Sequence, residues 1–157
     1  MNDREAITDL IYRYARAMDR MDAAQGKAIW HADGTADYGD VFIGKGQDFI
    51  DFVNTQHAGL LKHSHQMTNI ILEVDGHCAG SETYYTTALR MKRGEQENEI
   101  RVWGRYIDRW SKRDGRWGID HRIALRDFDD IRPVTPISND MRGRRDRDDP
   151  SYVVLAG

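Results

Sequence analysis

Apolar side chains recur at every third or fourth position over the first part of the chain. From residue 3 to residue 22 they form one stripe, which consists of Ile7, Leu10, Ile11, Tyr14, Ala17, Met18 and Met21. Because an α-helix completes a turn about every 3.6 residues, this spacing predicts an amphipathic helix. Shorter helices are predicted over 23–30, before a turn signal at Asp33-Gly34, and over 46–60.

After residue 62 the pattern changes to runs that are typical of β-strands. Four such runs occur, at 65–74, 77–92, 99–112 and 116–128. The first two are separated by Asp75-Gly76 and the last two by Asp114-Gly115, and Asp-Gly pairs are typical of tight turns between antiparallel strands. Helices followed by strands indicate an α+β domain, with the helices on one face of an antiparallel sheet that curls around a cavity for a small molecule.

The last part of the chain has a different composition. The segment 139–150 alternates arginine with aspartate and has almost no apolar residues, which is typical of an exposed segment. A length of 157 residues fits one domain. We therefore predict a domain over 1–132 and an arm over 133–157 that packs on the domain or on a neighbouring subunit.

Composition and charge exclude several classes of protein. The mean hydropathy is −0.74, and no apolar run approaches the roughly 20 residues of a membrane helix. The net charge of −3 divides into −6 over the first 100 residues and +3 over the rest, and neither value indicates nucleic-acid binding. Cys78 is the single cysteine, and residues 1–5 lack the basic-then-apolar order of a secretion signal. We expect a cytoplasmic protein that binds neither nucleic acid nor membranes.

The histidines are the first candidates for chemistry, because histidine changes its charge near neutral pH. Of the six, His57, His63 and His65 are the closest together. His63 and His65 would share one face of a strand and could hold a metal ion, but no third ligand follows at a supporting spacing, so we expect no metal site. A histidine oriented by a carboxylate and acting as a general base is the favoured hypothesis, although spacing alone does not choose the carboxylate.

Three further polar residues allow both a functional and a structural interpretation. Tyr14 lies on the apolar helix stripe, whereas Asp19 lies about 120–140° away from it and could be a solvated charge. Arg122 is predicted to share one strand face with Arg126, and it could bind an anionic group in a pocket or form a structural salt bridge. The opposite strand face would carry Ile119, His121 and Ile123.

Several motifs together resemble the SnoaL-like proteins of the nuclear-transport-factor-2-like superfamily. They are RYARAMDRMD at 13–22, WHADG at 30–34, HQMTNI at 65–70, EVDG at 73–76, GRYIDRW at 104–110 and RDGRW at 113–117, with His121-Arg122. The resemblance covers about residues 3–132. It implies a cone-shaped, curved antiparallel sheet wrapped around the N-terminal helices and enclosing a deep pocket. The most similar branch contains hexachlorocyclohexane dehydrochlorinase, bile-acid 7α-dehydratase and scytalone dehydratase.

This resemblance implies a lyase that works without a cofactor or a metal. Asp19 and His65 correspond to the family's catalytic dyad, Tyr14 to a helix tyrosine and Arg122 to an arginine of the last strand. His65 would take a proton from carbon, Tyr14 would donate a hydrogen bond to a carbonyl or a departing hydroxyl, and Arg122 would stabilise negative charge. The resemblance therefore implies a dehydratase that eliminates water from a steroid, polyketide or other hydrophobic cyclic substrate. The rest of the pocket is expected at His57, His63, Tyr85, Trp103 and Trp110.

Other functions fit the same residues. An isomerase or an aldol cyclase would begin with the same proton abstraction. A non-catalytic β subunit of a ring-hydroxylating dioxygenase would share the fold, and a third possibility is a pocket that only binds a ligand. We also expect a homo-oligomer, a trimer or a dimer, because an apolar outer sheet face near Ile119 and Ile123 and the arm over 133–157 favour self-association.

Overall fold

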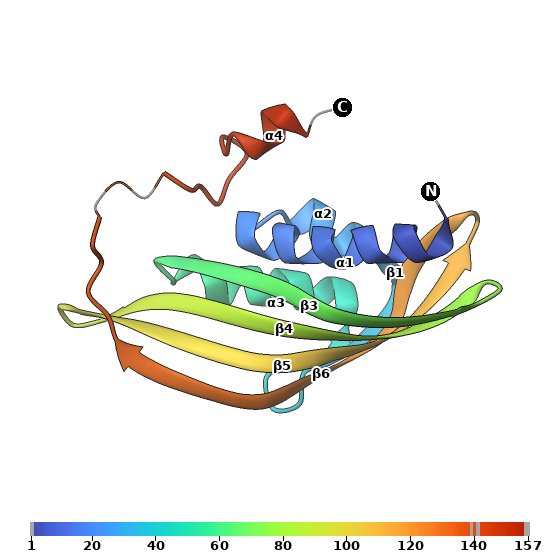
Figure 1. Ribbon diagram of the computed structural model, residues 1–157, viewed down its shortest axis with the longest axis horizontal. Coiled ribbons are helices and arrows are strands. Elements are labelled where there is room, and N and C mark those ends of the chain that lie inside the picture. The colour runs from blue at the N-terminus through green and yellow to red at the C-terminus, as the bar shows by residue number, and fades with distance from the viewer. Residues whose placement is uncertain (1, 139, 141, 156–157) are drawn as a thin grey trace.

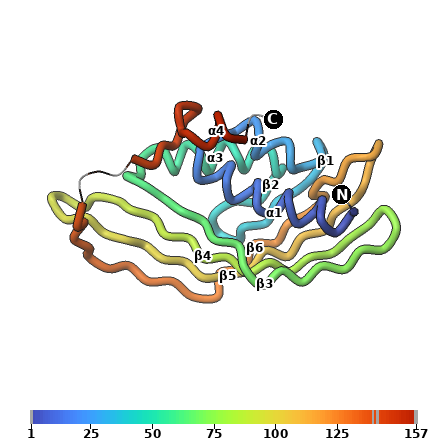
Figure 2. The backbone as a smooth tube through the Cα atoms, turned by 45° about the horizontal axis from the view of Figure 1, so that its top comes forward, coloured from blue at the N-terminus to red at the C-terminus, as the bar shows by residue number. Residues whose placement is uncertain are grey.

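Helices and a curved sheet form two layers in the computed structural model, which describes residues 2–138, 140 and 142–155 (Figure 1). In chain order the elements are α1 (Asp3–Arg20), α2 (Ala23–Ala28), β1 (Trp30–Asp37), β2 (Ile43–Lys45), α3 (Gly46–Ala58), β3 (Lys62–Asp75), β4 (Cys78–Arg93), β5 (Gln96–Arg113), β6 (Arg116–Pro133) and α4 (Ser151–Val154). The strand order is β2-β1-β6-β5-β4-β3. Helices α1 and α3 cover one face of the sheet, as Figures 1 and 2 both show. The predicted α+β class is confirmed.

The first helix follows its apolar stripe. It begins at a capping box, in which the Asn2 side chain accepts from the backbone N–H of Glu5 and the Glu5 side chain accepts from the backbone N–H of Asn2. It ends where Met21 adopts a left-handed conformation, with φ of 53°. The buried face includes Ile7, Ile11, Tyr14, Ala17 and Met18. This helix therefore packs its stripe on the sheet and presents Asp19 in its last turn.

The sheet is mixed rather than wholly antiparallel. Strands β3 to β6 pair in antiparallel fashion, but β1 pairs with β6 in parallel. The turn expected at Asp33-Gly34 is wrong, because both residues lie within β1. A Cβ atom at Gly34 would lie 2.5 Å from the backbone oxygen of Ile119, so glycine permits the close approach of the two strands. The long-range pairing with β6 thus overrides the local turn signal.

One extra residue in β6 changes which side chains face inward. Trp110 pairs with Ile119 whereas Arg109 pairs with His121, so Asp120 is an extra residue at a register shift. Simple alternation had placed Ile119 on the outer face, but its exposed fraction is 0%. That expectation is wrong, because the extra residue moves Ile119 to the same inward face as Arg122. The expected apolar outer face therefore does not include Ile119.

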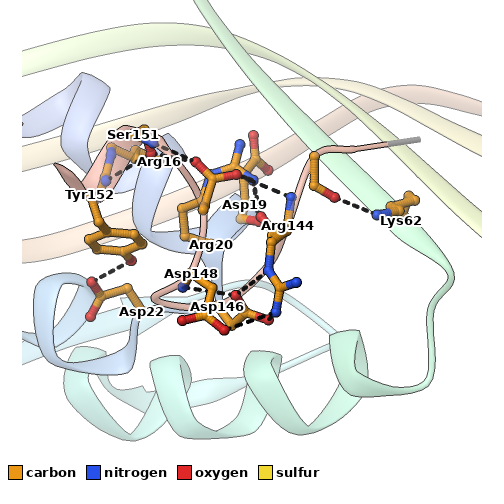
Figure 3. Close-up of polar contacts among 12 residues, drawn as sticks. Arg16, Asp19, Arg20, Asp22, Lys62, Arg144, Asp146, Asp148, Ser151 and Tyr152 are labelled. Atoms are coloured by element: carbon orange, nitrogen blue, oxygen red, sulfur yellow. Dashed lines mark hydrogen bonds and ion pairs between the residues drawn. The ribbon is translucent and has the colours of Figure 1, made fainter. Parts of the chain in front are cut away.

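Part of the C-terminal arm packs back onto the helices (Figures 1 and 2). The Tyr152 hydroxyl donates to Asp22 Oδ2 at 2.8 Å, and the Tyr152 ring lies under the guanidinium groups of Arg16 and Arg147. The Lys62 ammonium donates to the backbone oxygen of Gly143 at 2.6 Å, which joins the arm to the start of β3 (Figure 3). The domain boundary at residue 132 stays a prediction. No helix among the described residues is both long and apolar enough to span a membrane.

Candidate functional site

A hydrogen-bonded aspartate and histidine lie where the end of α1 meets the start of β3. His65 Nδ1 lies 2.7 Å from Asp19 Oδ1, and the backbone N–H of His65 donates to both Asp19 carboxylate oxygens at 3.0 Å. The side chains are 7% exposed for His65 and 13% exposed for Asp19. Because an ionised carboxylate only accepts hydrogen bonds, Nδ1 of the histidine carries the proton and Nε2 has a free lone pair. This imidazole is held in the tautomer that can accept a proton at Nε2.

A cavity of about 400 Å³ lies beside this pair, between α1, α3 and the concave face of the sheet. This volume is in the range of small-molecule sites. Most of the wall is apolar or aromatic, with Met18, Phe49, Phe52, Val53, Leu89 and Val102 among its residues. Its polar side chains include Tyr14, Tyr38, Gln56, His57, His65, Tyr85, Thr87 and Arg126. The arrangement fits a largely apolar ligand with a few polar groups at defined places.

Two tyrosine hydroxyls meet at the cavity wall. The hydroxyl oxygens of Tyr14 and Tyr38 are 2.9 Å apart, and the Tyr38 ring stacks on Phe49 with centroids 3.8 Å apart. Burial raises the pKa of Tyr38 well above its usual value, so its hydroxyl stays protonated and can donate. The sequence reasoning missed Tyr38, because it expected a turn near this part of the chain. The available signal was that Tyr38 is an aromatic residue directly after strand β1, a strand that the sequence pattern did not predict.

Arg122 lies beneath these tyrosines and does not line the cavity. Its guanidinium forms two 2.7 Å hydrogen bonds to the carboxylate of Asp108, and both side chains are at most 1% exposed. It also lies over the rings of Tyr14 and Tyr106, 4.2 and 4.1 Å from their centroids. We expected Arg122 to contact a leaving group directly, and this expectation is corrected. The structure contains the alternative, a buried salt bridge between Arg122 and Asp108. Asp108 was missed because the Asp108–Arg122 pairing depends on the β5–β6 register.

His57 and Tyr85 both line the cavity, as the sequence predicted. Burial, together with the neighbouring imidazoles and Arg145, lowers the pKa of His57 to about 3, so this side chain is neutral. Its Nδ1 is buried and has no hydrogen-bond partner among the described residues. The Tyr85 hydroxyl donates to the backbone oxygen of Leu125 at 3.3 Å, and burial raises its pKa to about 12.

Three other predicted pocket residues lie elsewhere. Trp103 is next to the cavity-lining Val102 on β5, so strand alternation turns it to the outer face, where it stacks on Phe128. Trp110 is 1% exposed and belongs to the core, where its indole N–H donates to Ser81 Oγ. His63 turns away from the cavity toward α1 and the C-terminal arm, with Nε2 2.8 Å from the backbone oxygen of Met18. These three expectations are corrected.

Metal binding has no candidate site in the part of the chain that the structure describes. No group of three or more His, Cys, Asp or Glu side chains there is placed to hold a metal ion.

The curved sheet with helices and an open cavity on its concave face has the cystatin-like α+β fold, which is also the fold of a solved protein from Nostoc punctiforme at a TM-score of 0.65. The model of the SnoaL-like domain matches residues 1–123. The chain therefore belongs to the SnoaL-like family, which confirms the resemblance inferred from the sequence. A comparison with curated proteins found no match.

Solved structures share this fold at low sequence identity. Hexachlorocyclohexane dehydrochlorinase LinA-type3 from Novosphingobium barchaimii has a TM-score of 0.72 and 22% identity, over 85% of this chain and 91% of that one. A scytalone dehydratase-like protein from Novosphingobium aromaticivorans has a TM-score of 0.71 and 19% identity, over 87% and 93%. A protein from the same species described as an aromatic ring hydroxylase has a TM-score of 0.72 and 23% identity, over 84% and 93%. At these identities the similarity shows a common fold.

Proposed function

We propose that this protein is a lyase that takes a proton from carbon and eliminates water, or another leaving group, from a hydrophobic cyclic substrate. One observation carries the proposal. His65 lines an apolar cavity while its Nδ1–H is held by Asp19, which leaves Nε2 as the proton acceptor. The names of the dehydrochlorinase and the dehydratase-like structure are consistent with elimination chemistry on this fold.

The first step is removal of a proton from a carbon next to a carbonyl group. His65 Nε2 accepts this proton, and the C–H electron pair moves toward the carbonyl to form an enolate. Asp19 stabilises the imidazolium that results, because its carboxylate oxygen is 2.7 Å from Nδ1. One of the two hydroxyl groups of Tyr14 and Tyr38 donates a hydrogen bond to the other. The second hydroxyl then donates to the enolate oxygen and stabilises its negative charge.

Elimination completes the reaction. The enolate reforms the carbonyl, a carbon–carbon double bond forms next to it, and the bond from the β-carbon to its hydroxyl group breaks. The proton held on His65 passes to the departing oxygen, so water leaves and the imidazole returns to its starting state. The net change is the loss of one water molecule, and the balance requires no oxidant or reductant. Arg122 takes part as a positioning residue, because its guanidinium lies over the Tyr14 ring and 3.5 Å from the Tyr38 hydroxyl.

A panel of β-hydroxyketones with one to three rings provides a direct test, with formation of the conjugated enone followed by absorbance and mass spectrometry. We expect the wild-type protein to form enone from at least one of them. We expect His65→Gln to lose about a hundredfold or more of that rate, because the base is removed. His121→Gln is the matched control, since His121 bonds to Thr35 at an exposed position.

Each outcome has a defined meaning. An unchanged rate in His65→Gln contradicts the mechanism, as does a wild-type protein that neither forms enone nor exchanges the carbon-bound proton with D₂O. Exchange or rearrangement that depends on His65 but loses no water assigns the same dyad to isomerisation or aldol cyclisation. Co-purification of the chain with a larger iron–sulfur subunit, without such activity, supports the non-catalytic alternative instead.

A further inference from the structure

Three imidazole rings pack together at one end of the cavity, where His57 and His65 line the wall and His63 turns away from it. The ring centroid of His57 lies 4.3 Å from that of His63 and 5.9 Å from that of His65, and the His63 and His65 centroids are 6.1 Å apart. Among the described contacts, Asp19 is the carboxylate that bonds to this cluster, and it bonds to His65. Two protonated rings at these distances would repel each other in a largely buried environment. Some feature of the chain must therefore decide which ring can hold a proton.

The hydrogen bonds of His63 fit its neutral form. Its Nε2 is 2.8 Å from the backbone oxygen of Met18, and because a carbonyl only accepts, Nε2 carries the hydrogen. Its Nδ1 then has a lone pair, which accepts from the guanidinium of Arg145 at 3.3 Å. A proton on Nδ1 would remove this acceptor and place a positive charge against the guanidinium.

Arg145 is itself fixed by the end of α3. Its guanidinium also donates to the backbone oxygens of His57 and Leu60, each at 2.9 Å. The His57 oxygen also accepts from the backbone N–H of Leu60, so the arginine adds a second donor there and supplies one to the Leu60 oxygen just beyond the helix. Arg145 lies on the C-terminal arm, and the arm is held to α1 and α2 by the contacts around Tyr152 (Figure 3). The contact with His63 therefore depends on the docked arm.

Other charges near His63 do not reverse this arrangement. From β3, β4 and β5, the groove beside His63 is lined by Lys62, Arg90, Lys92 and Glu97. Glu97 and the buried Glu99 both bond to Arg90, so Lys62 and Lys92 are the charges of this groove that are not paired with a carboxylate among the described contacts. On the α1 side, Asp19 faces His63 but is committed to His65. Burial is the main cause that lowers the pKa of His63. The hydrogen bond to Met18 and the charge of Asp19 act in the opposite direction, while His65 and, to a smaller extent, Arg145 lower the pKa further.

We propose that Arg145 is a positioning residue of the C-terminal arm, which holds His63 in one neutral tautomer so that the charge of Asp19 serves His65 alone. The arm is thereby coupled to the candidate site without lining the cavity. The inference concerns proton occupancy and tautomer, so it goes beyond the proposed lyase and does not depend on it.

Imidazole nitrogen NMR on the full-length wild-type protein provides the first test. Nitrogen chemical shifts distinguish the two neutral tautomers and the protonated ring of each assigned histidine. We expect His63 to have its hydrogen on Nε2 and to titrate below the ordinary histidine pKa of about 6.5. A pKa at or above that value, or a hydrogen on its Nδ1, overturns the proposal, and this measurement requires no variant.

Arg145→Gln tests the cause, and Arg144→Gln is the matched control on the same arm. Arg144 bonds to Asp146 and Asp148 and does not contact the histidines, so both variants remove one positive charge from the arm. We expect the protonated fraction of His63 at about pH 5 to rise about twofold or more in Arg145→Gln and to stay at the wild-type value in Arg144→Gln. Equal His63 titration in Arg145→Gln and the wild type, or equal effects of the two variants, overturns the proposal.

Discussion

Replacing Asp108 by asparagine should destabilise the protein by about 3–5 kcal/mol, because it leaves the buried guanidinium of Arg122 without its counter-charge. The two side chains share two 2.7 Å hydrogen bonds and are at most 1% exposed. Asparagine has nearly the same shape, so the loss reports charge and hydrogen bonding rather than a new void. Arg105 and Asp127 form a similar cross-strand pair on exposed parts of β5 and β6, with contacts of 2.9 and 3.0 Å.

Asp127→Asn is therefore the control, and we expect it to cost much less than Asp108→Asn, because exposed ion pairs contribute little to stability. Urea unfolding followed by the fluorescence of the four tryptophans gives the free energy of unfolding for each variant. Equal losses in the two variants would refute the argument from burial. The double variant Asp108→Leu with Arg122→Met should recover most of the loss, because it removes both charges together.

Three further predictions concern the fold and its assembly. The pKa of His57 is about 3 in the folded chain and near 6.5 when unfolded, so below about pH 6.5 the unfolded state binds more protons. Stability should consequently fall as the pH decreases from about 6.5 toward 3, and urea midpoints of His57→Gln should decline less steeply over that window. Gly46→Ala should cost about 1–3 kcal/mol in a urea titration, because its Cβ would lie 2.0 Å from the buried Trp30 ring, whereas Gly80→Ala meets nothing within 4 Å and should cost less. Self-association was expected from the sequence, so light scattering of the wild type should give a multiple of the chain mass of 18.2 kDa. Phe128→Glu should reduce this mass, because the Phe128 side chain is 61% exposed on the outer sheet face. A monomeric wild type would contradict the expected self-association.

Local patterns were sufficient for most of the secondary structure. The apolar stripe predicted α1, and the two Asp-Gly turns placed the four long strands to within a few residues. Strand β1 was missed because its partner, β6, lies about 90 residues later and pairs in parallel. The inward position of Ile119 was missed for a related reason, since one extra residue in β6 reverses the alternation.

The candidate site, like the fold, could be predicted from the sequence only in part. Asp19 and His65 were paired through the family resemblance, and the structure places them in hydrogen-bond contact. Periodicity could not orient Asp19, because helix α1 ends one residue later. The contacts of Asp108 and Arg145 depend on strand register and on the docking of the arm, neither of which a single sequence reveals.

The backbone bond to Asp19 has a consequence for redesign of the site. Both carboxylate oxygens accept from the main-chain N–H of residue 65, so the aspartate keeps an anchor that is independent of the side chain at that position. Under the proposed mechanism, a different base introduced at position 65 would still have this carboxylate beside it. The proposal thus predicts that the proton acceptor can be exchanged while Asp19 stays in place.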